Sequence, residues 1–189
     1  MKLSVCRDIS YEDGYNYFRN QMHNKYPGAN LYQKHVIVFR WDSVYYDIFH
    51  RDNMKAMDSM AAEYGKYKFE YVFITEMEEQ ASKDFLKRNS DEYKNVKMLY
   101  GMDDFISGLH NLKGIKVVKP THVFSVSRDG KVDDNPDIHK FKQVMFYSII
   151  DSNGEVLYTN GRKLMLLKDT AFLNKLNTLL PNRELKILN

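Results

Sequence analysis

The sequence predicts an α/β protein in which a mixed β-sheet is covered by helices. Two observations carry this prediction. Runs of β-branched and aromatic residues alternate with segments of helical periodicity, an order that favours parallel strands joined by right-handed crossovers. Near the C-terminus, two more apolar runs flank a connection that contains Asn153 and Gly154, which indicates an antiparallel hairpin. Parallel and antiparallel pairs in one chain make the sheet mixed.

The first half of the chain alternates helices and strands. Helices are predicted from the periodic spacing of apolar side chains, and unbroken apolar runs predict strands buried on both faces. Tyr15, Phe18 and Met22 form such a helical face, which Pro27 and Gly28 end. The expected elements are a helix over 11–26, a strand over 35–41, a helix over 48–64, a strand over 69–75 and a helix over 78–88.

The second half returns the chain to the sheet. A short extended piece, a short helix and a strand come first, and the polar stretch 133–140 then interrupts the sheet as a surface excursion. Asp169 is the expected N-cap of a last helix, which Pro181 ends. The expected elements are an extended piece over 96–100, a helix over 103–112, a strand over 121–127, hairpin strands over 144–150 and 155–159, and a helix over 170–180.

The composition indicates one domain and argues against a nucleic-acid partner and a membrane span. With 189 residues, 43% of them hydrophobic, the chain can bury one core. We expect residues 1–34 to be a helical extension packed on the domain formed by 35–180, with 181–189 as a tail. The net charge is only +3 and the charges are scattered, so no nucleic-acid partner is expected. No apolar run reaches the roughly 18 residues of a membrane span.

The chain has a single cysteine, Cys6, so one copy cannot perform dithiol chemistry. The residues before Cys6 loosely resemble a lipoprotein cleavage box, but the apolar stretch of a signal peptide is missing. We therefore interpret Cys6 as a thiol near the N-terminus. A lone thiol fits a reducing compartment and is also compatible with an oxidising one.

Phe39, Arg40 and Trp41 end the first predicted strand and are followed by a short loop and a long helix. This pattern resembles the aromatic residue and tryptophan that precede the CxxC motif in thiol-disulfide oxidoreductases of the TlpA and ResA type. The resemblance covers roughly residues 35–180. It implies a thioredoxin-like three-layer α/β/α sandwich with a mixed central sheet, an N-terminal helix and an insertion before the C-terminal hairpin. Counting from Trp41 as in that family places its two cysteines at Tyr45 and Ile48.

A second motif, GIKVVKPT over 114–121, resembles the family's cis-proline loop, with Pro120 as the cis residue. In active relatives, backbone groups beside this loop pair with an extended substrate peptide. The resemblance without the cysteines implies a redox-inactive binding or accessory module that needs no cofactor. Its expected contacts are with a peptide or a partner protein, and the implied binding residues are Trp41, Asp42, Tyr45, Tyr46, Ile48, Lys119, Pro120 and Thr121.

The resemblance implies a periplasmic or cell-envelope location if a signal peptide has been removed, and a cytoplasmic one otherwise. Oligomeric state stays open.

Two enzymatic alternatives stay open. Cys6 could serve a single-thiol redox enzyme, as a peroxidase or through an intermolecular disulfide. Asp42, Asp47 and His50 could perform general acid–base chemistry near the same face. The plainer interpretation of these three residues is that an aspartate caps the helix while His50 faces solvent.

Metal binding is not expected. His110, His122 and His139 lack the spacing of a metal site, and no second cysteine accompanies Cys6. A run of acidic residues is interpreted as complementing the dipole at the start of the predicted helix over 78–88, in preference to a cation site. These residues are Glu76, Glu78 and Glu79.

Overall fold

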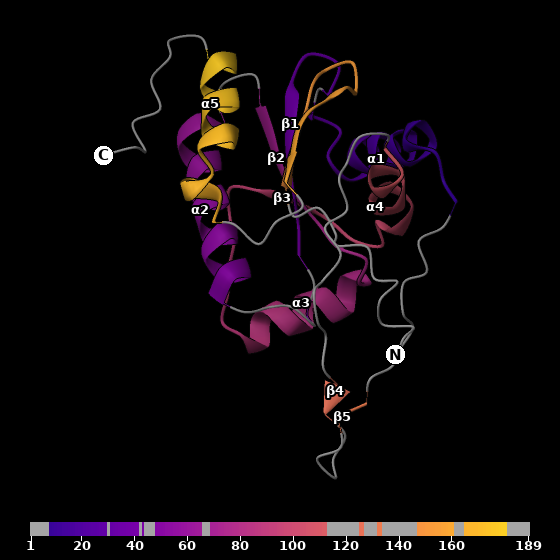
Figure 1. The fold of residues 1–189 in the computed structure, drawn as a ribbon, viewed down its shortest axis with the longest axis vertical. Coiled ribbons are helices and arrows are strands. Elements are labelled where there is room, and N and C mark those ends of the chain that lie inside the picture. The colour runs from indigo at the N-terminus through magenta and orange to yellow at the C-terminus, as the bar shows by residue number, and fades with distance from the viewer. Residues whose placement is uncertain are drawn as a thin grey trace.

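The computed structural model describes residues 8–29, 31–41, 43, 48–65, 69–112, 125–126, 132–133, 147–160 and 165–180. Five α-helices and seven strands lie within these ranges (Figure 1). The helices are α1 (Tyr11–Lys25), α2 (Ile48–Tyr64), α3 (Glu79–Arg88), α4 (Asp103–His110) and α5 (Thr170–Leu179). The strands are β1 (His35–Arg40), β2 (Phe69–Ile74), β3 (Lys97–Leu99), β4 (Ser125–Val126), β5 (Val132–Asp133), β6 (Tyr147–Ile150) and β7 (Val156–Asn160).

The central sheet has five strands in the order β3-β2-β1-β6-β7. Strands β1, β2 and β3 are parallel, whereas β6 runs antiparallel to β1 and β7 antiparallel to β6. The register pairs His35 with Phe69 and Arg40 with Ile74, so β1 and β2 overlap along their whole length. The predicted mixed sheet is confirmed, and its central strand is β1.

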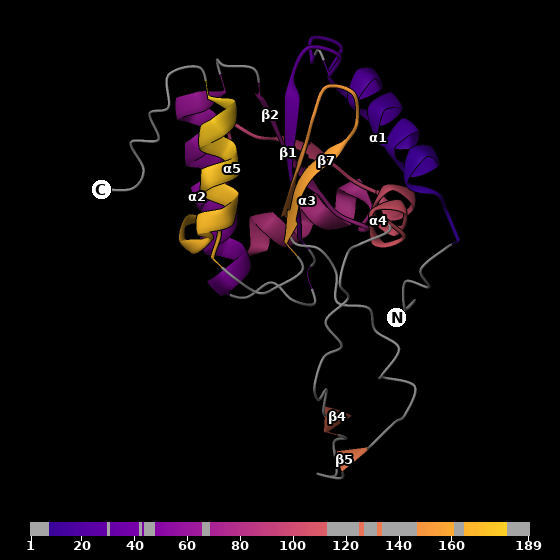
Figure 2. The same cartoon turned by 45° about the horizontal axis from the view of Figure 1, so that its top comes forward.

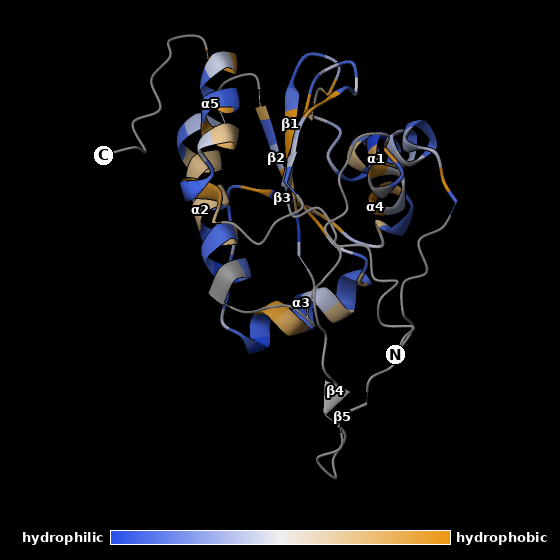
Figure 3. Ribbon diagram, in the orientation of Figure 1, coloured by the Kyte–Doolittle hydropathy of each residue, from blue (hydrophilic) through white to orange (hydrophobic). Residues whose placement is uncertain are grey.

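Helices cover both faces of this sheet, as Figures 1 and 2 show. Along β1, Ile37 and Phe39 belong to a core with α2 and α5, while Val36 and Val38 belong to a second core with α1 and α4. Successive side chains of a strand point to opposite faces, so a strand with two covered faces must be apolar throughout. In Figure 3 the hydrophobic colours accordingly concentrate on the strands and on α4.

Helix α1 packs against α4 through a close approach of two backbones. Ser10 accepts a hydrogen bond from the backbone N–H of Asp13 at 3.1 Å and so caps the start of α1. A Cβ on Gly14 would lie 2.7 Å from the carbonyl oxygen of Asp104, and one on Gly108 would lie 2.9 Å from that of Ser10. The predicted inner face of α1, made by Tyr15, Phe18 and Met22, is confirmed as buried.

The predicted hairpin of β6 and β7 is confirmed, and its turn is tied to α1. Gly154 has a φ of +89°, a conformation that favours glycine. The carbonyl oxygen of Gly154 accepts a hydrogen bond from the hydroxyl of Tyr11 at 2.7 Å. Asp151 accepts hydrogen bonds from the backbone N–H groups of Asn153 and Glu155, at 2.9 and 2.8 Å, and so shapes the turn.

One predicted strand is placed differently. Of residues 121–127, the structure describes Ser125 and Val126, which pair with Val132 and Asp133 in a separate two-stranded sheet. Figures 1 and 2 show this small sheet away from the central one. For Ser125 and Val126 the expectation that this strand joins the central sheet is wrong, and the edge of β1 away from β2 is taken by β6. Along the chain, this small sheet lies between α4 and β6.

None of the helices within the described ranges is long and apolar enough to cross a membrane.

Candidate functional site

The candidate site lies where β1 ends and α2 begins, beside the start of β6. The backbone N–H of Trp41 donates to the carbonyl of Ile74 at 3.0 Å, which extends the pairing of β1 with β2 by one residue. The indole of Trp41 is fully buried, with its ring 6.1 Å from that of Phe85. Trp41 was predicted among the binding residues; its side chain is buried in the core that α2 and α5 share with β1, and its role in binding stays a prediction.

The first turn of α2 contributes a buried histidine. His50 is 2% exposed, and its ring lies edge-on to Phe39 with 6.2 Å between the ring centroids. The interpretation that His50 faces solvent is therefore wrong. The spacing in the sequence could have shown this, because His50 precedes Met54 by four residues and Met57 by seven and so lies on the same helical stripe. Burial against an aromatic ring limits the access of a substrate to the imidazole.

The connection into α5 is anchored to α2. Asn53 is fully buried, and its side-chain oxygen accepts the backbone N–H of Leu166 at 2.5 Å. Leu166 begins a short 3-10 helix, Leu166–Lys168, that leads into α5. Because an unpaired buried amide is costly, this bond fixes the position of the connection against the N-terminal half of α2.

Asp169 is the centre of a buried polar cluster at the same end of the sheet. As predicted, it caps α5, accepting the backbone N–H of Phe172 at 3.1 Å. Its other oxygen accepts the hydroxyls of Tyr147 (at 2.8 Å) and Tyr158 and the side-chain amide of Asn160 (at 2.8 Å). Tyr147 and Asn160 lie opposite each other on β6 and β7. The pairing register of these two strands therefore brings the donors together, and this register cannot be read from the sequence.

The electrostatics of this cluster follow from its hydrogen bonds. Burial by itself would raise the pKa of Asp169, but the hydrogen bonds from Tyr158, Phe172, Tyr147 and Asn160 hold it below its ordinary value. Burial raises the pKa of Tyr147 well above its usual range, and the hydrogen bond to Asp169 raises it further. The cluster is therefore a carboxylate with neutral phenols, which suits it to holding β6, β7 and α5 together.

Two more polar anchors fix α2 along its length. Asp58 accepts the backbone N–H groups of three consecutive residues, Lys94, Asn95 and Val96, at 2.8 to 3.2 Å. Lys55 and Arg51 lie about one and two turns before Asp58 on α2. The side chain of Arg51 approaches the buried carboxylate of Asp91 at 3.3 Å, and that of Lys55 approaches it at 3.8 Å. These anchors attach α2 to the segment between α3 and β3.

The acidic residues before and within α3 are dispersed. Glu76 forms an ion pair with Arg40 at 2.8 Å, across the ends of β1 and β2. Glu79 pairs with Lys25 at 3.0 Å and with Lys83 at 2.8 Å, and these contacts lower its pKa. Glu79 lies in the first turn of α3, where a negative charge suits the helix dipole. Among the described side chains, no group of three or more candidate ligands could hold a metal ion.

Most of the other predicted site residues lie outside the described ranges. Ile48 is the exception and belongs to α2. The other predicted binding residues, Asp42, Tyr45, Tyr46, Lys119, Pro120 and Thr121, lie outside the described ranges, as do Cys6 and Asp47. Their roles stay predictions. The strand beside the end of β1 is β6, which residues 141–146 precede along the chain, whereas Pro120 precedes β4.

No protein-family model matches the chain, and no curated protein matches it. Among solved structures, it is similar to the thioredoxin domain of a thiol-disulfide oxidoreductase from Bacteroides vulgatus, with 10% identity and a TM-score of 0.44 over 79% of this chain and 81% of that one. It is also similar to yeast Sco1 with copper bound, with 18% identity and a TM-score of 0.45 over 81% of each chain. At such identities the likeness concerns the fold alone. The predicted α/β architecture with a mixed central sheet is confirmed by the strand order and pairing.

Proposed function

We propose that this chain is a redox-inactive thioredoxin-like module that binds an extended peptide or a partner protein at the end of the sheet where β1 meets α2. The observation that carries the proposal is the helix that follows β1. Ile48, the position to which the second cysteine of the oxidoreductases maps, lies in this helix, α2. The order of strand, short connecting segment and helix supports the count from Trp41.

The chemistry of the replaced positions supports the loss of redox activity. At a helix N-terminus, free N–H groups and the helix dipole stabilise a thiolate, which is why the active family places a cysteine there. The phenol of Tyr45 has an ordinary pKa of about 10 and forms no mixed disulfide. Ile48 has no reactive atom. Exchange through these two positions is therefore chemically impossible.

Two features of the described residues support a binding role. At the end of β1, Phe39 pairs with Tyr147, so the chain enters β6 directly beside the start of α2. The anchors at Asn53 and Asp169 fix the neighbouring connection between β7 and α5. A surface that is already fixed loses less conformational entropy when a peptide docks on it.

The absence of redox turnover is tested by insulin-disulfide reduction with dithiothreitol. We expect the rate with this protein to equal the uncatalysed rate. Turnover above that rate would contradict the proposal.

The alignment register is tested with cysteines. In a Cys6→Ser background, the double substitution Tyr45→Cys and Ile48→Cys should form an intramolecular disulfide under mild oxidation, as mass spectrometry would detect. The matched control is Tyr45→Cys with Lys55→Cys, because Lys55 lies about 10 Å further along α2 and cannot be bridged. Two persistent free thiols in the first variant would show that the count from Trp41 is wrong.

Binding is tested by titrating the ¹⁵N-labelled chain with a capped, uncharged valine–threonine hexapeptide. We expect chemical-shift changes at the amides of Ile48 and Tyr147, and weaker binding in Tyr45→Ala. Tyr32→Ala, at the opposite end of the sheet, is the matched control and should bind as the wild type does. Shifts absent from Ile48 and Tyr147, or equal loss in both variants, would overturn the binding site.

A further inference from the structure

A second surface lies at the opposite end of the sheet, where the chain enters β1. Tyr32 there is 74% exposed, more than any other large hydrophobic side chain that the structure describes. The guanidinium carbon of Arg19, on α1, lies 4.3 Å from the centroid of the Tyr32 ring and 5.9 Å from that of Tyr15. Arg19 is thus held between two aromatic rings, one buried and one protruding.

This surface carries hydrogen-bond donors that lack an acceptor. Tyr15 is 6% exposed, and its buried hydroxyl has no hydrogen-bond partner among the described residues. None of the ion pairs formed within the described ranges involves Arg19. A buried hydroxyl without a partner is unusual, because it leaves hydrogen-bonding capacity unused, and the half-buried guanidinium of Arg19 keeps its donors for a further acceptor.

The one acidic neighbour does not satisfy these donors. Burial raises the pKa of Tyr15, Arg19 partly offsets this, and Asp151 raises it again, so both charges act on the hydroxyl. Asp151 accepts the backbone N–H groups of Asn153 and Glu155 through one carboxylate oxygen, Oδ1, and forms no ion pair with Arg19 within the described ranges. The guanidinium of Arg19 therefore remains available to an acceptor from outside the chain.

We propose that Tyr15, Arg19 and Tyr32 form a docking site for a carboxylate on the surface of an acidic partner protein. A guanidinium presents two parallel N–H donors that match a carboxylate, and stacking on rings fixes its orientation before binding. Tyrosine and arginine are also enriched among the residues that dominate protein–protein affinity. Tyr32 protrudes and so does not line a cavity, which favours a protein over a small molecule.

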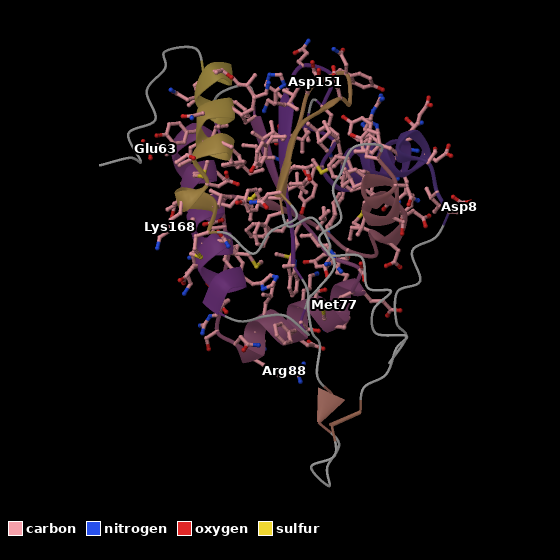
Figure 4. The ribbon with its side chains drawn as sticks, in the orientation of Figure 1. Asp8, Glu63, Met77, Arg88, Asp151 and Lys168 are labelled. Carbon is pink, nitrogen blue, oxygen red and sulfur yellow. The ribbon has the colours of Figure 1, made fainter. Side chains whose placement is uncertain are left out.

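The site is separate from the one proposed above. Tyr32 precedes the start of β1, whereas Ile48 follows its end, and the six residues of β1 span about 20 Å. Figure 4 shows this separation: Asp151, in the turn beside Tyr15, is labelled at the upper end of the molecule and Met77, just beyond β2, towards the lower end. Failure of either site leaves the other untouched.

The test is an NMR titration of the full ¹⁵N-labelled chain with acetyl-tetraglutamate amide. We expect the Nε–Hε resonance of Arg19 and the amide of Tyr32 to shift. Arg19→Gln should weaken binding about tenfold, as the loss of a charge-assisted hydrogen bond implies. Arg88→Gln, which removes the same charge at the far end of α3, should leave binding unchanged. Tyr15→Phe keeps the ring beside Arg19 and removes only a hydroxyl that is closed off from solvent, so it should leave binding unchanged.

Three results would overturn the proposal. Acetyl-tetraglutamine amide binding as tightly as the acidic peptide would exclude carboxylate recognition. An equal loss of peptide affinity in Arg19→Gln and Arg88→Gln would show that binding depends only on the net charge of the protein. Inorganic phosphate, added alone, shifting the same resonances with equal affinity would mean that the site takes a free oxyanion and not a partner's carboxylate.

Discussion

The two helical layers cover the same sheet but are attached to it by different means. Between α1 and α4 the contact is apolar and close: the rings of Phe18 and Phe105 stack at 4.4 Å, and Gly14 and Gly108 let the backbones approach. On the other side, α2 and α5 share an apolar core with the sheet and are held in addition by buried polar anchors, of which Asp169 is the centre. Beyond its apolar packing, this second layer depends on satisfying particular donors and acceptors.

This difference predicts different responses to substitution. Apolar packing loses stability in proportion to the volume that is lost or forced in. A polar anchor fails as a unit, because each partner that remains is buried without a hydrogen bond. The following predictions run from the largest expected effect to the smallest.

The largest effect is expected for Asp169→Ala. The substitution removes the N-cap of α5 and the carboxylate oxygen that accepts hydrogen bonds from the hydroxyl of Tyr147 and the amide of Asn160. We expect a loss of about 3 to 4 kcal/mol in the free energy of unfolding, measured by urea denaturation. Asp84→Ala, on the exposed side of α3, is the control and should change stability by less than about 0.5 kcal/mol. A loss for Asp169→Ala no larger than that of the control would show that the cluster is not an anchor.

The next effect is expected for Gly108→Ala. The new Cβ would lie 2.9 Å from the carbonyl oxygen of Ser10 and 3.2 Å from the Cα of Tyr11, both backbone atoms that cannot yield cheaply. We expect a loss of about 2 kcal/mol in spite of the better helix propensity of alanine. Gly28→Ala is the control, since a Cβ there meets nothing within 4 Å. Equal melting temperatures for both variants would argue against the close approach of α1 and α4.

A smaller effect is expected for Tyr26→Phe at the edge of the sheet. The Tyr26 hydroxyl accepts the N–H of Met98 at 3.0 Å and donates to the carbonyl of the same residue at 3.1 Å, on the edge strand β3. This contact covers an edge that could otherwise pair with another chain. We expect a loss of about 1 kcal/mol and a concentration-dependent association, measured by light scattering. A variant that stays as dispersed as wild type would mean that the hydroxyl does not protect this edge.

The smallest effect concerns pH. The hydrogen bonds to Asp169 hold its folded-state pKa below the ordinary value, so the unfolded chain takes up this proton first as the pH falls. The stabilisation is therefore fully present above the ordinary carboxyl pKa of about 3.9 and is lost only as the pH falls through the lower, folded-state value. Asp169→Asn should show a weaker dependence of stability on pH in this acidic range, in denaturation curves measured from pH 6 downwards. Identical slopes for the two proteins would contradict the assignment.

Local patterns in the sequence were enough for most of the elements. The helical face of Tyr15, Phe18 and Met22, the runs that became β1 and β2, and the Asn153-Gly154 hairpin were all predicted and are confirmed. Each depends on periodicity or turn chemistry within a few residues, which a sequence displays directly. The wrong placement of Ser125 and Val126 has the opposite cause: which strand takes the edge of β1 is decided by competition between distant segments, and β6 takes this edge.

What the sequence alone determined is the single cysteine, the order of helices and strands, and the absence of a dithiol at Tyr45 and Ile48 if the count from Trp41 holds. Only the tertiary structure decided that Trp41 is buried and that Asp169 gathers three side-chain donors. The physical reason is that burial and hydrogen-bond partnership are properties of pairs distant along the chain. The type of a residue determines which interactions its side chain can make, and only the fold determines which partners lie next to it.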